Sequence, residues 1–235
     1  MAELSGRVAF VTGASRGIGA AVARRLHGEG ARVALTSRRG EDLGLEGALG
    51  LRCDVRSRAE VEAAVGATVE RFGGLDVLVN NAGVGAYGAF LELEPEAMEE
   101  MVDVNLKGTL YATRAALPHL LGSEAADIVT VASVAGLRGL PNEAVYCASK
   151  FGQTGFMRAL DHELREQGVR CTTICPGGVA TDFAMGRGRE PDMPELEGMM
   201  TPEDVAETVL FALTRPRTHR ILTLSYRPVT EPSAG

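Results

Sequence analysis

Val8-Ala9-Phe10-Val11-Thr12-Gly13-Ala14-Ser15-Arg16-Gly17-Ile18-Gly19 is the stretch that decides the fold of this chain of 235 residues. An apolar run breaks into three glycines and then into a helical apolar pattern that includes Val22 and Leu26, which predicts a strand, a tight turn and a helix. Glycines let the backbone approach a pyrophosphate closely, and the free N–H groups at the start of the helix favour its negative charge. A flexible surface loop is the alternative interpretation of the same glycines.

Short apolar runs alternate with longer helical patterns along the rest of the chain. Strands are predicted near 7–12, 32–36, 50–53, 76–79, 127–132, 170–175 and 220–224. This order predicts an α/β fold of Rossmann type, a doubly wound parallel sheet of about seven strands with helices on both faces, in a three-layer α/β/α sandwich. Ligands of such sheets bind beyond the carboxyl ends of the strands, so the residues that follow the strands are expected to converge on one crevice: Gly13, Asn81, Ser133 and Pro176.

Composition limits the classes of protein to be considered. With 45% hydrophobic and 23% charged residues, the chain suits a single domain over 1–235 with a sizeable core. A net charge of −7 argues against binding to nucleic acid, whose phosphates are also negative. No stretch is long and apolar enough to span a membrane. The first predicted strand leaves no room for a signal peptide. Four cysteines without C-x-x-C spacing and four scattered histidines predict no metal site, reduced thiols and a cytoplasmic protein.

Tyr146 and Lys150 lie four residues apart, which places both side chains on one face of a helix. An ammonium beside a phenol is expected to lower the phenol pKa toward neutrality, where it can exchange a proton with a carbonyl or an alcohol. Ser133 follows an apolar strand-like run and offers a hydroxyl for the same site. An ordinary surface helix is the alternative for this pair.

These features together resemble the short-chain dehydrogenases/reductases, in their single-domain subgroup, over nearly the whole chain. The motifs that carry the resemblance are Thr12-Gly13-Ala14-Ser15-Arg16-Gly17-Ile18-Gly19, Asp54-Val55, Asn80-Asn81-Ala82-Gly83, Asn105, Ser133, Tyr146-Cys147-Ala148-Ser149-Lys150 and Pro176-Gly177. The resemblance implies an oxidoreductase that interconverts a carbonyl and a secondary alcohol by hydride transfer, with Tyr146 as general acid and base. It also implies that Ser133 holds the reacting oxygen, that Lys150 binds the nicotinamide ribose, and that Asn105 anchors a water for proton relay.

The expected cofactor is NADP(H), because the run Thr36-Ser37-Arg38-Arg39 after the second strand carries no acid to bond a ribose hydroxyl. Arg38 and Arg16 suit the extra phosphate, although arginines merely solvated on a loop are the alternative. The resemblance adds Asp54 and Val55 at the adenine and Asn81 and Gly83 at the ribose, each of which equally suits a turn, while Asn80 is interpreted as structural. The predicted cofactor-binding residues are Gly13, Ser15, Arg16, Gly17, Ile18, Gly19, Ser37, Arg38, Asp54, Val55, Asn81, Ala82, Gly83, Tyr146, Lys150, Pro176, Gly177, Val179 and Thr181.

Substrate identity is predicted only by class. Apolar candidates for the pocket are Val134, Ala135, Leu137, Leu140, Pro141, Phe183 and Met185. Arg138, Arg187 and Arg189 either meet an acidic substrate or are simply solvated. If they bind substrate, the substrate is a hydroxy- or oxo-acid, or a 3-oxoacyl thioester on an acidic carrier. The tail through 224–228 resembles relatives that act on small 3-hydroxy acids. Segment 183–200, rich in glycine and proline, is predicted to be a substrate lid.

Three further expectations concern the rest of the chain. The connection 39–50, which carries four glycines, is expected to form at most a turn or two of helix. Helices near 96–120 and 146–166 are expected to pair two subunits into a homodimer or a homotetramer, as in the family. A cofactor-binding sensor or scaffold without catalysis is the alternative function, against which the intact Asn105, Ser133, Tyr146 and Lys150 argue.

Overall fold

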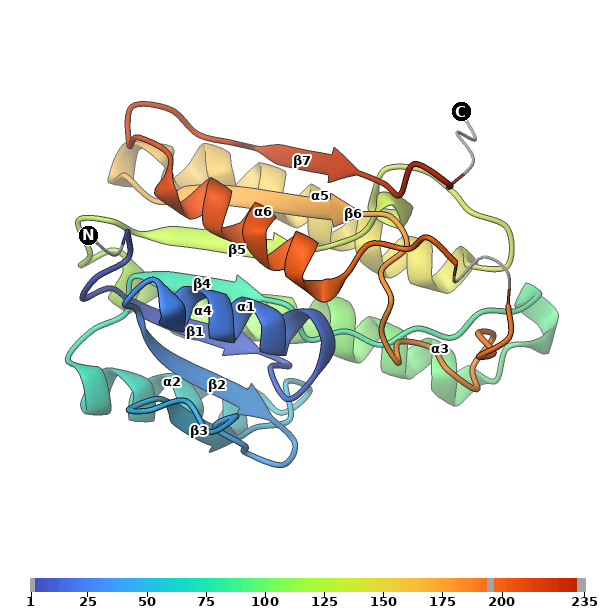
Figure 1. Ribbon diagram of the computed structural model, residues 1–235, viewed down its shortest axis with the longest axis horizontal. Coiled ribbons are helices and arrows are strands. Elements are labelled where there is room, and N and C mark those ends of the chain that lie inside the picture. Colours follow the sequence, from blue (N-terminus) through green and yellow to red (C-terminus); the bar gives the residue numbers. More distant parts are fainter. Residues whose placement is uncertain (1–2, 194–196, 232–235) are drawn as a thin grey trace.

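Seven parallel strands form one sheet in the order β3-β2-β1-β4-β5-β6-β7 (Figure 1). The computed structural model describes residues 3–193 and 197–231. The strands are β1 (Val8–Thr12), β2 (Arg32–Ser37), β3 (Leu49–Arg52), β4 (Val77–Asn80), β5 (Asp127–Val131), β6 (Arg170–Pro176) and β7 (Thr223–Tyr226). The predicted Rossmann-type fold is confirmed.

The seventh strand lies later in the chain than predicted. Residues 220–224 were expected, but pairing with β6 begins at Thr223, opposite Thr173. Arg220 instead forms an ion pair of 2.5 Å with Asp161 of helix α5 (Ala144–Leu164), and the chain then approaches β6 at Leu222, whose carbonyl oxygen accepts from the Thr173 N–H at 3.0 Å.

Helices cover both faces of the sheet (Figure 1). Helices α1 (Gly17–Gly28) and α6 (Pro202–Thr214) pack on one face, and α2 (Arg58–Phe72), α4 (Gly108–Leu120) and α5 pack on the other. Strand β1 shows why. Val8 and Phe10 pack in the core under α2, α4 and α5, whereas Ala9 and Val11 pack in the core under α1 and α6. Alternating side chains that are all apolar require a cover on each side.

The helix predicted over 96–120 is interrupted. It consists of α3 (Pro95–Met101), a π-helical turn (Val102–Lys107) and α4. The side chain of Asn105 in this turn is fully buried, donates to the carbonyl oxygen of Val84 at 2.9 Å and accepts from the Val84 N–H at 2.8 Å. A π-helical turn contains one more residue than an α-helical turn, which changes the direction of the side chains. Here the π turn carries Asn105, whose side chain points into the protein.

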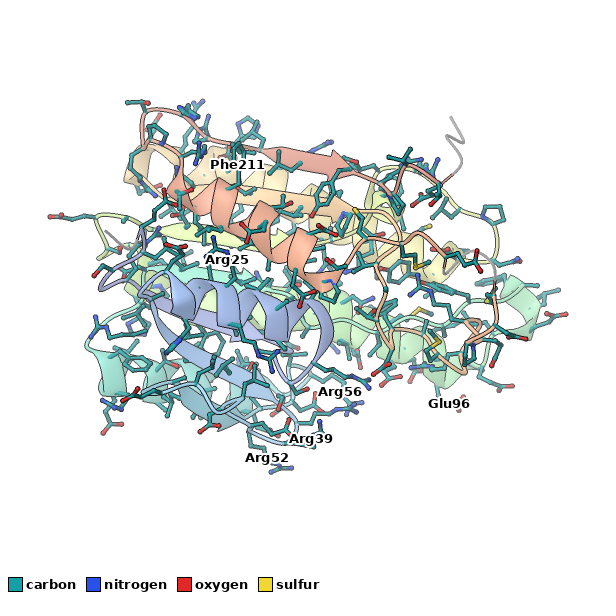
Figure 2. The ribbon with its side chains drawn as sticks, viewed as in Figure 1. Arg25, Arg39, Arg52, Arg56, Glu96 and Phe211 are labelled. Atoms are coloured by element: carbon teal, nitrogen blue, oxygen red, sulfur yellow. The ribbon has the colours of Figure 1, made fainter. Side chains whose placement is uncertain are left out.

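The connection between β2 and β3 contains turns and no helix. Gly40 has φ +77°, and a Cβ there would lie 2.8 Å from the backbone nitrogen of Arg52. The connection therefore lies against β3, in agreement with the expectation of little helix. Figure 2 shows Arg39, Arg52 and Arg56 projecting at the carboxyl ends of β2 and β3.

Candidate active site

A cavity of about 1070 Å³ lies at the carboxyl ends of the strands. Every residue predicted to bind the cofactor lines it, as do Ser133, Tyr146 and Lys150. Asn105 does not line the cavity, because its side chain is buried behind Val84. The tertiary structure thus brings together residues from positions 13 to 181, and their roles in binding remain predictions.

The glycine turn after β1 packs closely on the turn after β4 and leaves the start of α1 free. Gly13 has φ +65°, and a Cβ there would lie 2.7 Å from the Cα of Ala82. The side-chain amide of Asn81 donates to the carbonyl oxygens of Thr12 and Gly13 at 2.9 and 3.1 Å, which fixes the turn. No side chain caps the first turn of α1, so its N–H groups can bind an anion.

Arginines surround the part of the cavity next to β2. Arg38 is exposed and has no carboxylate within 4.0 Å among residues 3–193 and 197–231. Arg16 lies 3.6 Å from Asp182, with both side chains mostly exposed, which makes this ion pair weak. Arg56 was not predicted; it lines the cavity and binds the Asp54 carboxylate at 2.6 Å, which lowers the pKa of Asp54. Its place directly after Asp54-Val55 was the available signal.

Tyr146 lies at the centre of an aromatic cluster. Its ring is 5.7 Å from the rings of both Tyr87 and Phe183, measured between centroids, and the side chain is 6% exposed. Burial raises the pKa of Tyr146 above its usual value, while a hydrogen bond with Ser133 lowers that pKa by less. The expectation that Lys150 lowers the phenol pKa toward neutrality is therefore wrong for this structure, because desolvation of the phenolate is the larger effect.

Lys150 is buried beside Tyr146. Its Nζ donates to the carbonyl oxygen of Val131 at 3.2 Å and lies 5.7 Å from the centre of the Tyr146 ring. Burial lowers the pKa of Lys150 to about 8. The ammonium is thus still the main form at neutral pH and can donate to a ligand hydroxyl.

Asn105, Asn80 and Ser149 form the support behind the site. Asn105 donates to the Ser149 hydroxyl at 3.0 Å, and that hydroxyl donates to the carbonyl oxygen of Tyr146 at 2.7 Å. Asn80 is buried and donates to Thr113 at 3.0 Å, as expected of a structural residue. The relay role expected of Asn105 stays a prediction.

The substrate side of the cavity only partly follows the predicted residues. Val134, Leu140, Pro141 and Phe183 line it, whereas Ala135, Leu137 and Met185 do not. Of the three arginines only Arg189 lines it; Arg187 pairs with Glu100 at 2.9 Å and Arg138 with Glu231 at 3.4 Å. Residues that the sequence reading missed are Tyr87, Asn142, Glu143, Thr230 and Glu231. Only Glu143 had a local signal, three residues before Tyr146.

The segment 183–200 borders the cavity through several residues, although 194–196, including Pro194, lie outside the described residues. Phe183, Gly188, Arg189, Met193 and Met199 line the cavity. The described part has no helix, and it forms turns in which Gly186 N–H donates to the Arg189 carbonyl at 2.8 Å. Ala180, three residues before the segment, donates its N–H to the carbonyl oxygen of Met200 at the segment's end, at 2.8 Å. The lid function is not tested by this geometry.

The described ranges contain neither a metal-binding cluster nor a membrane-spanning helix. Residues 3–193 and 197–231 contain no group of three or more histidine, cysteine, aspartate or glutamate side chains placed to hold a metal ion. Among the same residues, no helix has the length and apolar character needed to cross a membrane.

Comparisons with known proteins agree with this geometry. A family model described as short chain dehydrogenase matches residues 7–192. An uncharacterized oxidoreductase of Staphylococcus aureus (strain USA300) is 35% identical over 237 residues, covering 97% of this chain and 100% of the relative. A closed form of serine dehydrogenase complexed with NADP⁺ is 33% identical with a TM-score of 0.90, covering 97% of each chain. The 3-ketoacyl-(acyl-carrier-protein) reductase from Brucella melitensis, complexed with NADH, is 30% identical with a TM-score of 0.84, covering 95% of this chain and 98% of that one.

Proposed function

Because the chain belongs to the short-chain dehydrogenase/reductase family, we propose that this oxidoreductase uses NADP(H) to interconvert a carbonyl and a secondary alcohol, with Tyr146 as general acid and base. The observation that supports this most directly is the convergence of Ser133, Tyr146 and Lys150 on the cavity that the glycine turn also lines. A nicotinamide cofactor, when bound, supplies or accepts the hydride.

The side chains of the protein supply the proton chemistry. The raised pKa of Tyr146 keeps the phenol protonated at neutral pH, so it can donate a proton to a carbonyl oxygen. Ser133, hydrogen-bonded to Tyr146, is placed to hold the same oxygen. Lys150 supplies a cation on the cavity wall for the nicotinamide ribose and for the phenolate that forms.

The cavity fits a dinucleotide. The absence of a Cβ at Gly13 lets the turn after β1 pack directly on Ala82, another residue of the cavity wall, and the uncapped start of α1 lines the same space. Arg38 and Arg16, with no acid at the end of β2, support NADP(H) over NAD(H). The serine dehydrogenase neighbour binds NADP⁺ and the ketoacyl reductase neighbour binds NADH, so these neighbours alone do not choose between the cofactors.

Several further assignments belong to this proposal. The chain acts as one domain with a substrate lid at 183–200, works on a small molecule, and forms a homodimer or homotetramer. A cytoplasmic location suits its four buried cysteines, which form no disulfide. The substrate is a small 3-hydroxy acid or a 3-oxoacyl thioester, and the neighbours named serine dehydrogenase and 3-ketoacyl-(acyl-carrier-protein) reductase support one class each.

The test is a screen of NADPH oxidation over ketones, quinones, oxo-acids and acetoacetyl thioesters, together with NADP⁺ reduction over the matching alcohols. Tyr146→Phe should lower turnover by roughly 10²- to 10⁴-fold and change the NADPH dissociation constant little, because it removes the proton donor and keeps the ring. Tyr111→Phe, which loses a hydroxyl on α4 away from the cavity, is the matched control. Cofactor binding without turnover of any compound would favour the sensor or scaffold instead.

A further inference from the structure

Two titratable side chains, Glu143 and Arg189, line the cavity without an oppositely charged group within 4.0 Å in the described parts of the chain. Within the described parts of the chain, the Glu143 carboxylate has no hydrogen bond or ion pair. Arg189 has no carboxylate within 4.0 Å there, and its guanidinium makes only long contacts, to the carbonyl oxygens of Phe183 (3.4 Å) and Val179 (3.5 Å) and to the Met199 sulfur (3.5 Å). Both residues are half-buried. A partly desolvated charge without a partner is costly, which is a reason to expect a ligand for each.

Backbone contacts hold the segments of both residues against Tyr87 and Gly88. Gly88 N–H donates to the carbonyl oxygen of Asn142, the residue before Glu143, at 2.9 Å. Tyr87 N–H donates to the carbonyl oxygen of Arg187 at 2.9 Å. A Cβ on Gly188 would lie 2.6 Å from the Cβ of Tyr87, so Arg189 follows a residue packed directly on this tyrosine.

Tyr87 in turn connects both charges to the reacting group. Its ring meets the Tyr146 ring edge-on at 5.7 Å. Glu143 is the residue directly before α5 and precedes Tyr146 by three residues in the chain. Glu143 and Arg189 therefore both belong to segments that meet at Tyr87 and Gly88, next to the phenol of Tyr146.

We propose that Glu143 and Arg189 select a small 2-amino-3-hydroxy acid, or the corresponding 3-oxo acid, by binding its ammonium and its carboxylate while its oxygen at carbon 3 reaches Ser133 and Tyr146. The proposal rests on the oxidoreductase function proposed above. The Arg189 guanidinium would bind the substrate carboxylate and the Glu143 carboxylate would bind the substrate ammonium. Both substrate groups are attached to the same carbon. A simple hydroxy acid would leave Glu143 without a partner. An acyl thioester offers no cation at all, and a site built for a polar group rejects the analogue that lacks it.

A matched set of alcohols tests the proposal. Threonine carries both charges, 3-hydroxybutyrate lacks the amine, 1-amino-2-propanol lacks the carboxylate, and 2-propanol lacks both. The stereoisomers of threonine are tested separately, and kcat/KM is measured for oxidation with NADP⁺. For at least one isomer of threonine, kcat/KM should be about tenfold or more above that of each of the other three alcohols, since each lost ionic contact weakens binding by roughly that factor.

Charge-removing variants assign the contacts. Glu143→Gln should lower kcat/KM for threonine about 10- to 100-fold and leave 3-hydroxybutyrate unchanged, because only the ammonium loses its partner. Arg189→Gln should lower kcat/KM for threonine and for 3-hydroxybutyrate, which both carry a carboxylate, and leave kcat/KM for 1-amino-2-propanol unchanged. Glu190→Gln and Arg165→Gln remove exposed charges that do not line the cavity and should change none of the four values.

Outcomes against the proposal are distinct from failure of the proposed function. The substrate class is wrong, and the oxidoreductase function stands, if carbonyls or alcohols are turned over but an amine and a carboxylate on the substrate do not raise kcat/KM. The same holds if Glu143→Gln lowers kcat/KM for all four alcohols equally. Turnover of no compound in the wider screen would overturn the function itself. Calorimetric titration of the wild-type protein with threonine and with 3-hydroxybutyrate, both with saturating NADPH, gives an independent answer: tighter threonine binding supports the proposal, and equal binding contradicts it.

Discussion

The side-chain amide of Asn105 donates a 3.0 Å hydrogen bond to the hydroxyl of Ser149, the residue before Lys150. This bond joins the π-helical turn to the helix that carries the two central residues of the site. Asn105 also holds both backbone groups of Val84, which lines the cavity. One buried side chain therefore fixes two walls of the site relative to each other.

Replacing Asn105 should affect both stability and activity. Asn105→Ala leaves the Val84 N–H and the Ser149 hydroxyl without their buried partner, and we expect a loss of about 2–4 kcal/mol in the free energy of unfolding. Urea denaturation measures this. Asp103→Asn, in the same turn but with a partly exposed carboxylate, should cost less than about 1 kcal/mol. Equal losses in the two variants would contradict a special role for Asn105.

Arg38 should control the choice of cofactor. The wild type is expected to bind NADPH more tightly than NADH, and Arg38→Asp should reverse or abolish that difference, because an acid repels the extra phosphate and can accept from ribose hydroxyls. Fluorescence titration of both cofactors decides this. Arg39→Asp is the control, since Arg39 does not line the cavity and pairs with Glu41. Tighter binding of NADH by the wild type would disprove the two-arginine argument.

Assembly should depend on the exposed face of α5. Leu160 of this helix is buried and Phe156 is partly buried, whereas Phe151 is 45% exposed. Phe151→Glu should therefore convert the predicted homodimer or homotetramer toward monomers by removing apolar contact area. Light scattering measures the mass. Phe211→Glu, on the outer face of α6 (Figure 2), changes a phenylalanine of similar exposure and should leave a dimer. A monomeric wild type at micromolar concentration would exclude this assembly.

The segment 183–200 should become protected when ligands bind. Met200, at the end of the segment, accepts a hydrogen bond from Ala180, three residues before its start, so we expect the residues between them to close together over the cavity. Trypsin cleavage at Arg187 and Arg189 should slow with saturating NADPH and a substrate analogue. Cleavage in the loop 215–220, near the amino ends of the strands, serves as the internal control. Unchanged cleavage at Arg187 and Arg189 would leave the segment as an ordinary surface loop.

Glu143 should make stability depend on pH. Burial raises the pKa of Glu143 from 4.5 to about 7; Glu231 also raises this pKa, and Arg189 and Arg138 oppose the rise. A group with a raised folded-state pKa contributes its full stability below the unfolded value and loses it as the pH rises through the folded value. Relative to Glu143→Gln, the wild type should lose about 1–3 kcal/mol between roughly pH 4.5 and pH 7.5, the lower figure allowing for partial exposure. Urea unfolding at the two pH values measures it, and a constant difference between the proteins would refute the shift.

The fold and most of the cavity wall followed from short-range patterns. The run from Val8 to Gly19 predicts its own strand, turn and helix because apolar spacing and glycine act within a few residues. Six strand positions were accurate to a residue for the same reason. The seventh was displaced because Arg220 is held by Asp161, a contact 59 residues away that no local pattern contains.

The tertiary structure alone decided the electrostatics of the site. Lys150 is four residues from Tyr146, yet the pKa of Tyr146 rises, because rings from Tyr87 and Phe183 help to bury the phenol. Glu143 is near Tyr146 in the chain, but Arg189 comes to the same cavity wall through the backbone contacts that Tyr87 and Gly88 make with both segments. Sequence by itself determined where strands, turns and helices form, since these depend on neighbours along the chain. Burial and charge pairing were decided by the packing, since they depend on neighbours in space.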